Sequence, residues 1–332
     1  MDSLSIQLEG KAVAVAAPPS IYESCLFVPV VRALMPLCGV LDLVAPESMA
    51  SFWEKITPGV RMTVVPDGAG AREIAGIMKD GGAGHEVSLA WDHTPVAEAF
   101  AKLKIRCRAG YEMPGFGKTL TEVLKHDDEP GRHQVHYYLD LLKGMGIDAF
   151  VAANFQTPPL PPRGPQARIA LVPGSELGTA FKWPIDRFVE LAQRLQAGCD
   201  AELVILSLPG MVNEANELAR RLYGQAKNFA GQFDVPGLMD AIPYCSLMIA
   251  NDGSLPLLAG HVGLPAVVIY GPSEPGEVAP FGNQHSLLTV NAVCSPCRQM
   301  ACLYDHHECM QDMTVEQVLQ AAAAYLLPTG RG

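Results

Sequence analysis

A proline-rich run near the middle of the chain restricts the possible folds more than any other feature. Five prolines fall within eight residues: Pro158, Pro159, Pro161, Pro162 and Pro165. Proline has no backbone N–H and is excluded from helix interiors and central strands, so the run predicts a stiff, extended connection. We therefore expect a linker at residues 158–166 between domains at residues 1–157 and 167–332. A long loop inside one domain is the alternative.

Short apolar runs alternate with segments of helical period on both sides of this linker. In the first half we expect strands at residues 12–17, 40–44, 62–65, 86–90 and 105–108 and a helix at 24–37. In the second half we expect strands at 168–172, 202–206, 247–250 and 266–270 and helices at 185–196, 212–223 and 255–262. Uninterrupted apolar strands are typical of parallel sheets covered on both faces. The predicted fold class is α/β, with two Rossmann-like domains whose parallel sheets face each other across a cleft. The last helix is expected in the second domain or packed back on the first.

The composition excludes some classes of protein. A length of 332 residues fits two domains, and a formal net charge of -11 disfavours nucleic-acid binding, which needs a broad basic surface. Acidic residues precede the first apolar run, which therefore indicates a strand rather than a signal peptide. No apolar run reaches the roughly 18 residues of a membrane span. Nine cysteines, five of them scattered through apolar segments, suit the reducing cytoplasm, where we expect the protein.

Residues that follow the strands of the second half form the candidate site, because ligands of open parallel sheets bind beyond the carboxyl ends of the strands. Gly174 and Ser175 follow the first of these strands, in a turn whose backbone N–H groups can approach a phosphate. Lys182 in the same segment can supply a positive charge. An ordinary turn with a surface lysine is the alternative.

A second polar segment, Asp252, Gly253 and Ser254, lies between a buried strand and the next expected helix. The amides of a helix N-terminus attract anions, although Asp252 can instead be a simple N-cap. A third strand ends in a Gly-Pro-Ser turn within residues 267–275. Together the three segments predict a cradle for a pyrophosphate and a ribose. Neither a GxGxxG fingerprint nor a Walker A loop is present, which disfavours NAD enzymes and P-loop ATPases.

These segments resemble glycosyltransferase family 9, the ADP-heptose:lipopolysaccharide heptosyltransferases. PGSELGTAFKWP resembles the family's PGA-x-(4 or 5)-K-x-W-P, and NDGSLPLLAGHVGLPAVVIYGPSEP resembles its NDSGLMHVAAALxxPLVALYGPTxP. CSPCRQMACLYDHHECMQDMTVEQVLQ is similar to its cysteine-containing tail. The resemblance is strong over residues 168–327 and traceable before the linker.

The resemblance implies a GT-B fold and an inverting, metal-independent transfer of heptose from ADP-heptose to the lipopolysaccharide inner core. It implies the nucleotide in the second domain, the acceptor in the first, and possible peripheral contact with the inner face of the cytoplasmic membrane. Asp252, Gly253 and Ser254 match the family's diphosphate-contacting D-S-G, with glycine and serine exchanged. Ser175 matches the first nucleotide-contacting turn, and Glu214 is a candidate for the adenosine side. No cofactor is implied for catalysis.

The family's catalytic base is an aspartate in a G-D pair after the first strand, and here the matching residues are Tyr22 and Glu23. Glu23 can remove the proton of the attacking hydroxyl in the same way. A glutamate that merely favours a helix N-terminus is the alternative. Lys182 is the candidate for stabilising the leaving diphosphate, one place after the family lysine.

Two further positions depart from the family pattern. Phe181 stands at the family lysine and Leu257 at the family histidine, with His261 one helical turn later. His261 is either a substitute or simply a packed side chain. These departures admit a nucleotide-sugar-binding relative with weakened catalysis. A nucleotide-sugar 2-epimerase, which shares the two-domain architecture, is a third hypothesis.

A basic cluster in the first half is the candidate acceptor site. We expect Arg106 and Arg108 to bind the acceptor. Their period-two spacing with Lys102 and Lys104 would put four cations on one strand face, and Lys118 lies nearby in the sequence. Such a face suits phosphorylated or carboxylated core sugars. A solvated edge strand guarded by charges is the alternative.

Four cysteines near the C-terminus have the spacing C-x2-C-x4-C-x6-C: Cys294, Cys297, Cys302 and Cys309. Four thiolates can hold a structural zinc ion tetrahedrally. Reduced thiols in a loop, or disulfides, are the alternatives. Any such metal is expected to be structural, since the transfer chemistry does not require it.

Overall fold

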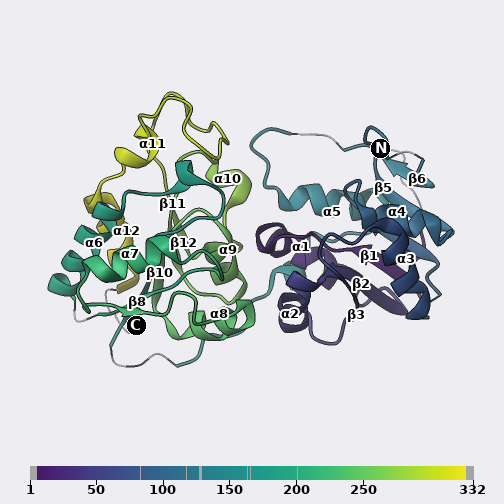
Figure 1. Ribbon diagram of the computed structural model, residues 1–332, viewed down its shortest axis with the longest axis horizontal. Coiled ribbons are helices and arrows are strands. Elements are labelled where there is room, and N and C mark those ends of the chain that lie inside the picture. The colour runs from purple at the N-terminus through teal and green to yellow at the C-terminus, as the bar shows by residue number, and fades with distance from the viewer. Residues whose placement is uncertain are drawn as a thin grey trace. The chain divides into compact units, whose positions relative to one another are not determined.

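The computed structural model describes residues 6–82, 84–116, 118–126, 129–162, 164, 166–199 and 201–326. The chain divides into two compact units, Met1–Phe155 and Gln156–Gly332, each with its own sheet (Figure 1). The expected linker at residues 158–166 begins shortly after this boundary, and its Arg163 and Pro165 lie outside the described residues.

The N-terminal unit is built on a six-stranded parallel sheet with the order β3-β2-β1-β4-β5-β6. Its strands are β1 (Ala12–Ala16), β2 (Val40–Pro46), β3 (Arg61–Val65), β4 (Val87–Ala90), β5 (Cys107–Tyr111) and β6 (Glu122–Leu124). The helices are α1 (Ile21–Leu34), α2 (Glu47–Ile56), α3 (Ala71–Asp80), α4 (Pro95–Lys102) and α5 (Val135–Gly144).

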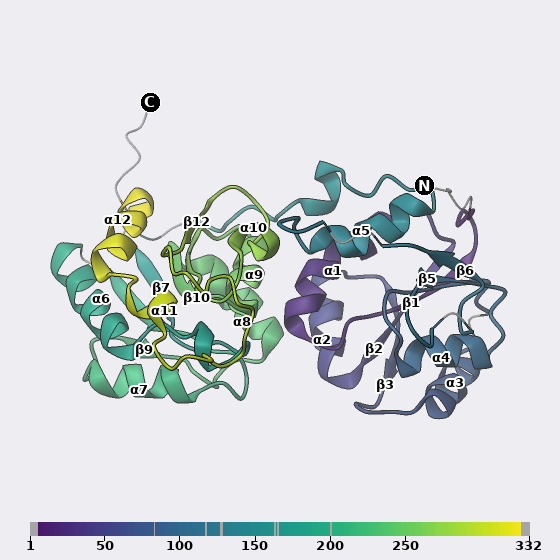
Figure 2. The same ribbon diagram turned by 90° about the horizontal axis from the view of Figure 1, so that it is seen from above.

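Helices cover both faces of this sheet. On one face lie α3 and α4 (Figure 2). Ile74 of α3 and Phe100 of α4 share a buried core there with Ala14 and Val44 of the sheet. On the other, Phe27 of α1 is the centre of an aromatic cluster; Phe27 makes edge contacts with three rings, those of Trp53, Trp91 and Tyr138. Residues 24–31 of α1 are all buried, so this helix is a core element rather than an amphipathic surface helix.

The C-terminal unit has the same plan, with the strand order β12-β11-β10-β7-β8-β9. Its strands are β7 (Arg168–Val172), β8 (Glu202–Ile205), β9 (Lys227–Asn228), β10 (Leu247–Asn251), β11 (Ala266–Ile269) and β12 (His285–Leu288). Its helices are α6 (Ile185–Gly198), α7 (Asn213–Arg221), α8 (Val235–Ala241), α9 (Ser254–His261), α10 (Pro275–Val278), α11 (Glu308–Gln311) and α12 (Val315–Leu326). Two parallel sheets, each with helices, confirm the predicted α/β class.

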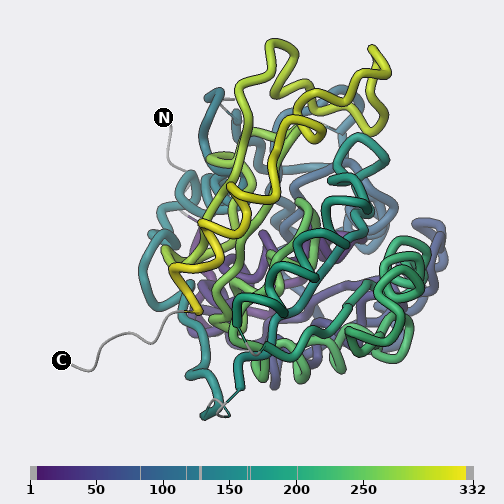
Figure 3. Tube along the Cα trace, turned by 90° about the vertical axis from the view of Figure 1, so that its left-hand side faces the viewer, coloured from purple at the N-terminus to yellow at the C-terminus, as the bar shows by residue number. Residues whose placement is uncertain are grey.

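The last helix packs within its own unit. In α12, Val318 and Ala322 are fully buried in one core with Leu191 of α6 and Ile249 of β10. Figure 3 shows α12 in yellow beside the teal helix α6. The apolar face of α12 is thus covered by α6 and the C-terminal sheet, which agrees with the first of the two placements expected for the last helix.

One expected strand is shifted, and three strands are not predicted. The strand expected at residues 105–108 corresponds to β5, which begins only at Cys107, because α4 continues to Lys102 and the chain turns at Lys104 with φ of 55°. The basic residues of this segment therefore do not share one strand face. The edge strands β6, β9 and β12 are not predicted, because they are short and only partly buried, and so lack an apolar run.

Candidate functional site

The candidate site lies at the carboxyl edge of the C-terminal sheet, where β7 and β10 pair side by side. Asn251, the last residue of β10, is 1% exposed. Its Nδ2 donates to the Pro173 carbonyl at 2.7 Å, and its Oδ1 accepts from the Trp183 N–H at 3.0 Å. One buried amide therefore fixes both ends of the segment that carries Gly174, Ser175 and Lys182.

Ser175 ties the same turn to the residue after β10. Its Oγ donates to the Asp252 carbonyl at 2.8 Å and accepts from the Leu177 N–H at 3.2 Å. The hydroxyl is thus used to hold the turn. What Gly174 and Ser175 can still offer a ligand is backbone N–H groups.

Asp252 is an unusual buried acid. Its Oδ2 accepts from the Ser273 hydroxyl at 2.6 Å, so the third predicted segment does reach the site. Burial raises the pKa of the Asp252 carboxyl to about 7, and the nearby charge of Glu176 adds to the rise, while the Ser273 hydrogen bond opposes it. Near neutral pH this side chain is therefore partly protonated and can donate as well as accept a hydrogen bond.

The start of α9 is occupied by a side chain from the β7 turn. The Glu176 carboxylate accepts from the Ser254 N–H at 2.6 Å and also from the Ser254 hydroxyl. Between them lies Gly253, with φ of 154°, and a Cβ there would lie 2.8 Å from Glu176 Oε2. Glycine is required at 253 both by its backbone conformation and by this close approach.

Lys182 and Glu214 form an ion pair across the site, 32 residues apart in sequence. Their side chains are 23% and 28% exposed. Glu214 also lies beside Gly174, where a Cβ would be 3.7 Å from its Oε2. The structure therefore brings together two residues that the sequence suggests separately, one for the diphosphate and one for the adenosine.

A small cavity at this edge is lined by the turn after β7, the end of β10, and the segment after β8. Its volume is about 10 Å³, the space of roughly one water molecule. Ser207 lines it, and its buried Oγ has no hydrogen-bond partner among the residues that the structure describes. An unsatisfied buried hydroxyl facing a cavity is a group that a ligand can satisfy.

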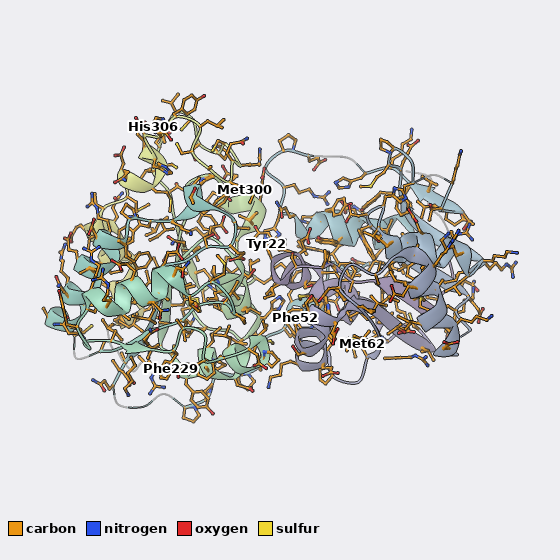
Figure 4. All side chains as sticks on the ribbon, viewed as in Figure 1. Tyr22, Phe52, Met62, Phe229, Met300 and His306 are labelled. Atoms are coloured by element: carbon orange, nitrogen blue, oxygen red, sulfur yellow. The ribbon has the colours of Figure 1, made fainter. Side chains whose placement is uncertain are left out.

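Glu23 lies in the first turn of α1, which follows β1 in the N-terminal unit. The Ser20 hydroxyl caps this helix: it accepts from the Glu23 N–H at 3.2 Å and donates to Glu23 Oε2 at 2.7 Å. The S-x-x-E pattern is a capping box that the sequence itself displays. Tyr22, at the glycine position of the family, lies in the same turn (Figure 4).

The predicted acceptor residues are not brought together as a strand face. The Arg108 guanidinium donates to the Thr119 carbonyl at 2.6 Å and to the Ile105 carbonyl at 2.5 Å. It therefore braces the loops around the amino end of β5, while Arg106 is exposed. One strand face shared by the four cations is wrong, because the chain turns between α4 and β5. A role of Arg106 and Arg108 toward an acceptor stays a prediction.

Phe181 and Leu257, which depart from the family pattern, and His261, the candidate substitute, are all buried. Phe181 and Leu257 are packed in the C-terminal unit. His261 is 4% exposed and packs edge-to-face on Phe281, with ring centroids 5.4 Å apart. The structure therefore favours the alternative in which His261 is a packed side chain.

The four cysteines predicted as zinc ligands are gathered in one place. All four, with His306 and His307, line one small pocket in and beside the loop before α11, where Figure 4 labels His306. Burial, followed by the neighbouring thiols, raises the pKa of Cys309 to about 11. Within the described ranges, however, no three cysteine, histidine or acidic side chains are arranged to hold a metal ion. The structural zinc ion stays a prediction.

Comparison with known proteins gives the family. The model of glycosyltransferase family 9 (heptosyltransferase) matches residues 92–308, well over half of the chain. The chain belongs to this family.

Similar proteins support the assignment. Lipooligosaccharide heptosyltransferase 2 of Campylobacter jejuni is 27% identical over 209 residues, which cover 59% of this family 9 chain and 64% of that protein. The chain thus spans just under two thirds of that relative's length. The structure of Escherichia coli ADP-heptose LPS heptosyltransferase II has a TM-score of 0.77 at 20% identity and covers 95% of this chain and 98% of the other. A family 9 glycosyltransferase from Veillonella parvula reaches 0.84 at 18% identity, covering 98% and 100%. The solved structures show that the GT-B fold is shared.

Three site residues of this family 9 chain escape prediction from its sequence: Glu176, Ser207 and the bridging Asn251. Glu176 carries a usable signal, because an acidic residue inside a turn expected to bind an anion is out of place. Ser207 carries none beyond its position after a strand, and Asn251 carries only its position at the end of a buried strand, beside the polar segment that follows. Within the described residues, none of the helices is long and apolar enough to cross a membrane.

Proposed function

We propose that this protein is an inverting heptosyltransferase that uses ADP-heptose and the inner core of a lipopolysaccharide or lipooligosaccharide. The observation that carries the proposal is the convergence of three strand-end segments on the start of α9, beside the buried Asp252. Backbone N–H groups at a helix N-terminus and in a tight turn are the donors that bind a diphosphate.

The donor's parts have candidate partners at this edge. The diphosphate lies over the start of α9 and the Gly174–Ser175 turn, with Lys182 as its cation. Glu214 and Ser207 take the adenosine side, since a carboxylate can accept from ribose hydroxyls. Asp252, whose raised pKa leaves it partly protonated near pH 7, donates to a phosphate or sugar oxygen without adding a full negative charge.

Transfer then requires one base and one leaving group. Glu23 takes the proton of an acceptor hydroxyl as that oxygen forms its bond to the anomeric carbon of heptose. The bond from that carbon to the diphosphate oxygen breaks, and ADP departs with the electron pair. Lys182 and the N–H groups stabilise the charge that develops on the diphosphate, and the configuration at the anomeric carbon inverts.

One observation supports the weakened relative as a second candidate. The family lysine is replaced by the buried Phe181, and Lys182 is already paired with Glu214. If that pair persists with donor bound, Lys182 is not available to the diphosphate, and binding without turnover results.

The test is incubation with ADP-heptose and a heptose-deficient core acceptor, followed by mass spectrometry of the acceptor and measurement of released ADP. We expect an acceptor that has gained one heptosyl group, and a kcat at least about 100-fold lower for Glu23→Gln, the loss typical of a removed general base. ADP binding to Glu23→Gln should match the wild type. Binding without any transfer selects the weakened relative, and a product that stays nucleotide-linked selects the epimerase.

A further inference from the structure

We propose that the Glu176 carboxylate is an internal competitor for the donor diphosphate, occupying the anion site at the start of α9 until the donor displaces it. The inference rests on the proposed donor site and names the group with which the donor exchanges. In this proposal Glu176 determines how tightly the donor binds and takes no part in the transfer chemistry.

The start of α9 has no capping side chain of its own. The first N–H groups of a helix need acceptors, which a Ser, Thr, Asp or Asn at the N-cap normally supplies. Here the N-cap is Gly253, and Glu176, 78 residues away from Ser254, accepts from the Ser254 N–H at 2.6 Å and from its hydroxyl. A carboxylate thus already fills the position at which a helix N-terminus binds an anion.

Glu176 and a diphosphate cannot both accept from the Ser254 N–H, which the carboxylate already occupies. Even a Cβ on Gly253 would lie 2.8 Å from Glu176 Oε2, and the neighbouring cavity of about 10 Å³ holds no more than roughly one water. Two anions facing the same N–H group also repel each other. A ligand anion must therefore replace the carboxylate.

Glu176 can leave while the backbone stays in place. On one side the Ser175 hydroxyl is bonded to the Asp252 carbonyl, and on the other the Ala180 N–H donates to the Met300 carbonyl at 3.0 Å. The Glu176 side chain itself is only half-buried, so a change of rotamer toward solvent frees the Ser254 N–H. Such changes are fast, so the exchange lowers the apparent affinity in proportion to the fraction of time for which the carboxylate holds the site.

A second observation points to a ligand at the same place. The Ser207 hydroxyl, 4% exposed, lines the cavity with Glu176 and has no hydrogen-bond partner among the described residues. Glu176 satisfies the helix end but not this hydroxyl. An internal carboxylate therefore lines the pocket and meets part of its hydrogen-bonding capacity, as expected of a group that stands in for a ligand.

The test is isothermal titration calorimetry of Glu176→Gln with ADP, inorganic pyrophosphate and adenosine. If the carboxylate holds the site nine-tenths of the time, its removal tightens ADP and pyrophosphate about tenfold, because apparent affinity scales with the fraction of competent protein. Adenosine has no phosphate and should change less than about twofold by the same reasoning. Glu190→Gln is the control: it removes one carboxylate of the same unit, an exposed partner of Arg194, and should leave all three affinities unchanged.

The outcomes separate this inference from the proposed function. Equal binding of pyrophosphate by wild type and Glu176→Gln, or an equal change for adenosine, overturns the internal competitor whatever the donor is. If ADP binds neither protein while pyrophosphate binds the variant more tightly, the competitor stands and the ADP donor is wrong. Glu176→Asp guards against misfolding: it keeps the charge on a shorter arm that cannot reach Ser254, and it too should tighten pyrophosphate.

Discussion

Asp252→Asn should stabilise this protein at alkaline pH and have almost no effect on stability at acidic pH. Burial holds the pKa of the folded carboxyl at about 7, against an ordinary value of 3.8. As the pH rises between these values, the unfolded chain releases a proton that the folded chain keeps, so stability falls with rising pH and the loss is complete above pH 7. Asparagine has a similar shape, still accepts from Ser273, and does not ionise.

The size of the effect follows from the shift. A shift of about three pKa units, at about 1.4 kcal/mol each, corresponds to roughly 4 kcal/mol. At pH 8 the free energy of unfolding of the variant should exceed that of the wild type by this amount. For a unit of this size that corresponds to roughly 10 °C in melting temperature. The gain should disappear near pH 4, where Asp252 is protonated in both states.

Differential scanning calorimetry of both proteins at half-unit steps from pH 4 to 8 measures this difference. Other titrating groups are common to the two proteins and cancel in the comparison. A difference in stability between variant and wild type that stays constant with pH would contradict the raised pKa of Asp252. A difference that falls as the pH rises would contradict it too. Either result would mean that Asp252 is ionised and well solvated in the folded state.

Two more outcomes follow from the site and its surroundings. Asn251→Ala should lower the free energy of unfolding by about 2–5 kcal/mol, because the buried Pro173 carbonyl and Trp183 N–H lose their hydrogen-bond partner. Chemical denaturation measures this loss, and an unchanged free energy of unfolding would mean that water replaces the amide. Dialysis against EDTA should change the initial rate of heptosyl transfer less than about twofold, since the groups proposed to act on the diphosphate are Lys182 and backbone N–H donors. A rate that is lost on dialysis and restored by added zinc or magnesium would contradict this prediction.

Much of the fold can be predicted from the sequence, because parallel strands buried on both faces leave uninterrupted apolar runs. The strand at Arg168–Val172 and the one ending at Asn251 are examples, and their carboxyl ends locate the site. The position of Asp252 after such a strand is enough to place it at the edge of the sheet. Its deep burial, and the pKa that follows, depend on Ser273 and neighbouring segments and need coordinates.

The remaining features depend on contacts between residues far apart in sequence. The Glu176 carboxylate accepts a hydrogen bond from Ser254, 78 residues later in the sequence, and no local sequence pattern predicts this pairing. Lys104 shows a second limit: a lysine at positive φ is uncommon, so period-two spacing of cations suggests a strand where the backbone turns instead. Arg108 shows a third, because nothing in the sequence tells whether a guanidinium braces carbonyl groups of its own loops or faces a ligand.

In the proposed donor complex, the backbone N–H at the start of α9 binds the diphosphate of ADP. Calorimetric titration of ADP into Ser254→Pro tests this contact directly. Proline is well tolerated at the first position of a helix, where Ser254→Pro removes the N–H together with the hydroxyl. Ser254→Ala removes the hydroxyl alone and keeps the N–H, so the difference between the two variants reports on the N–H. We predict a dissociation constant at least about tenfold weaker for Ser254→Pro, the loss of a hydrogen bond to a charged group, and a change within about threefold for Ser254→Ala. Ser254→Pro that binds ADP as tightly as the wild type would contradict the account.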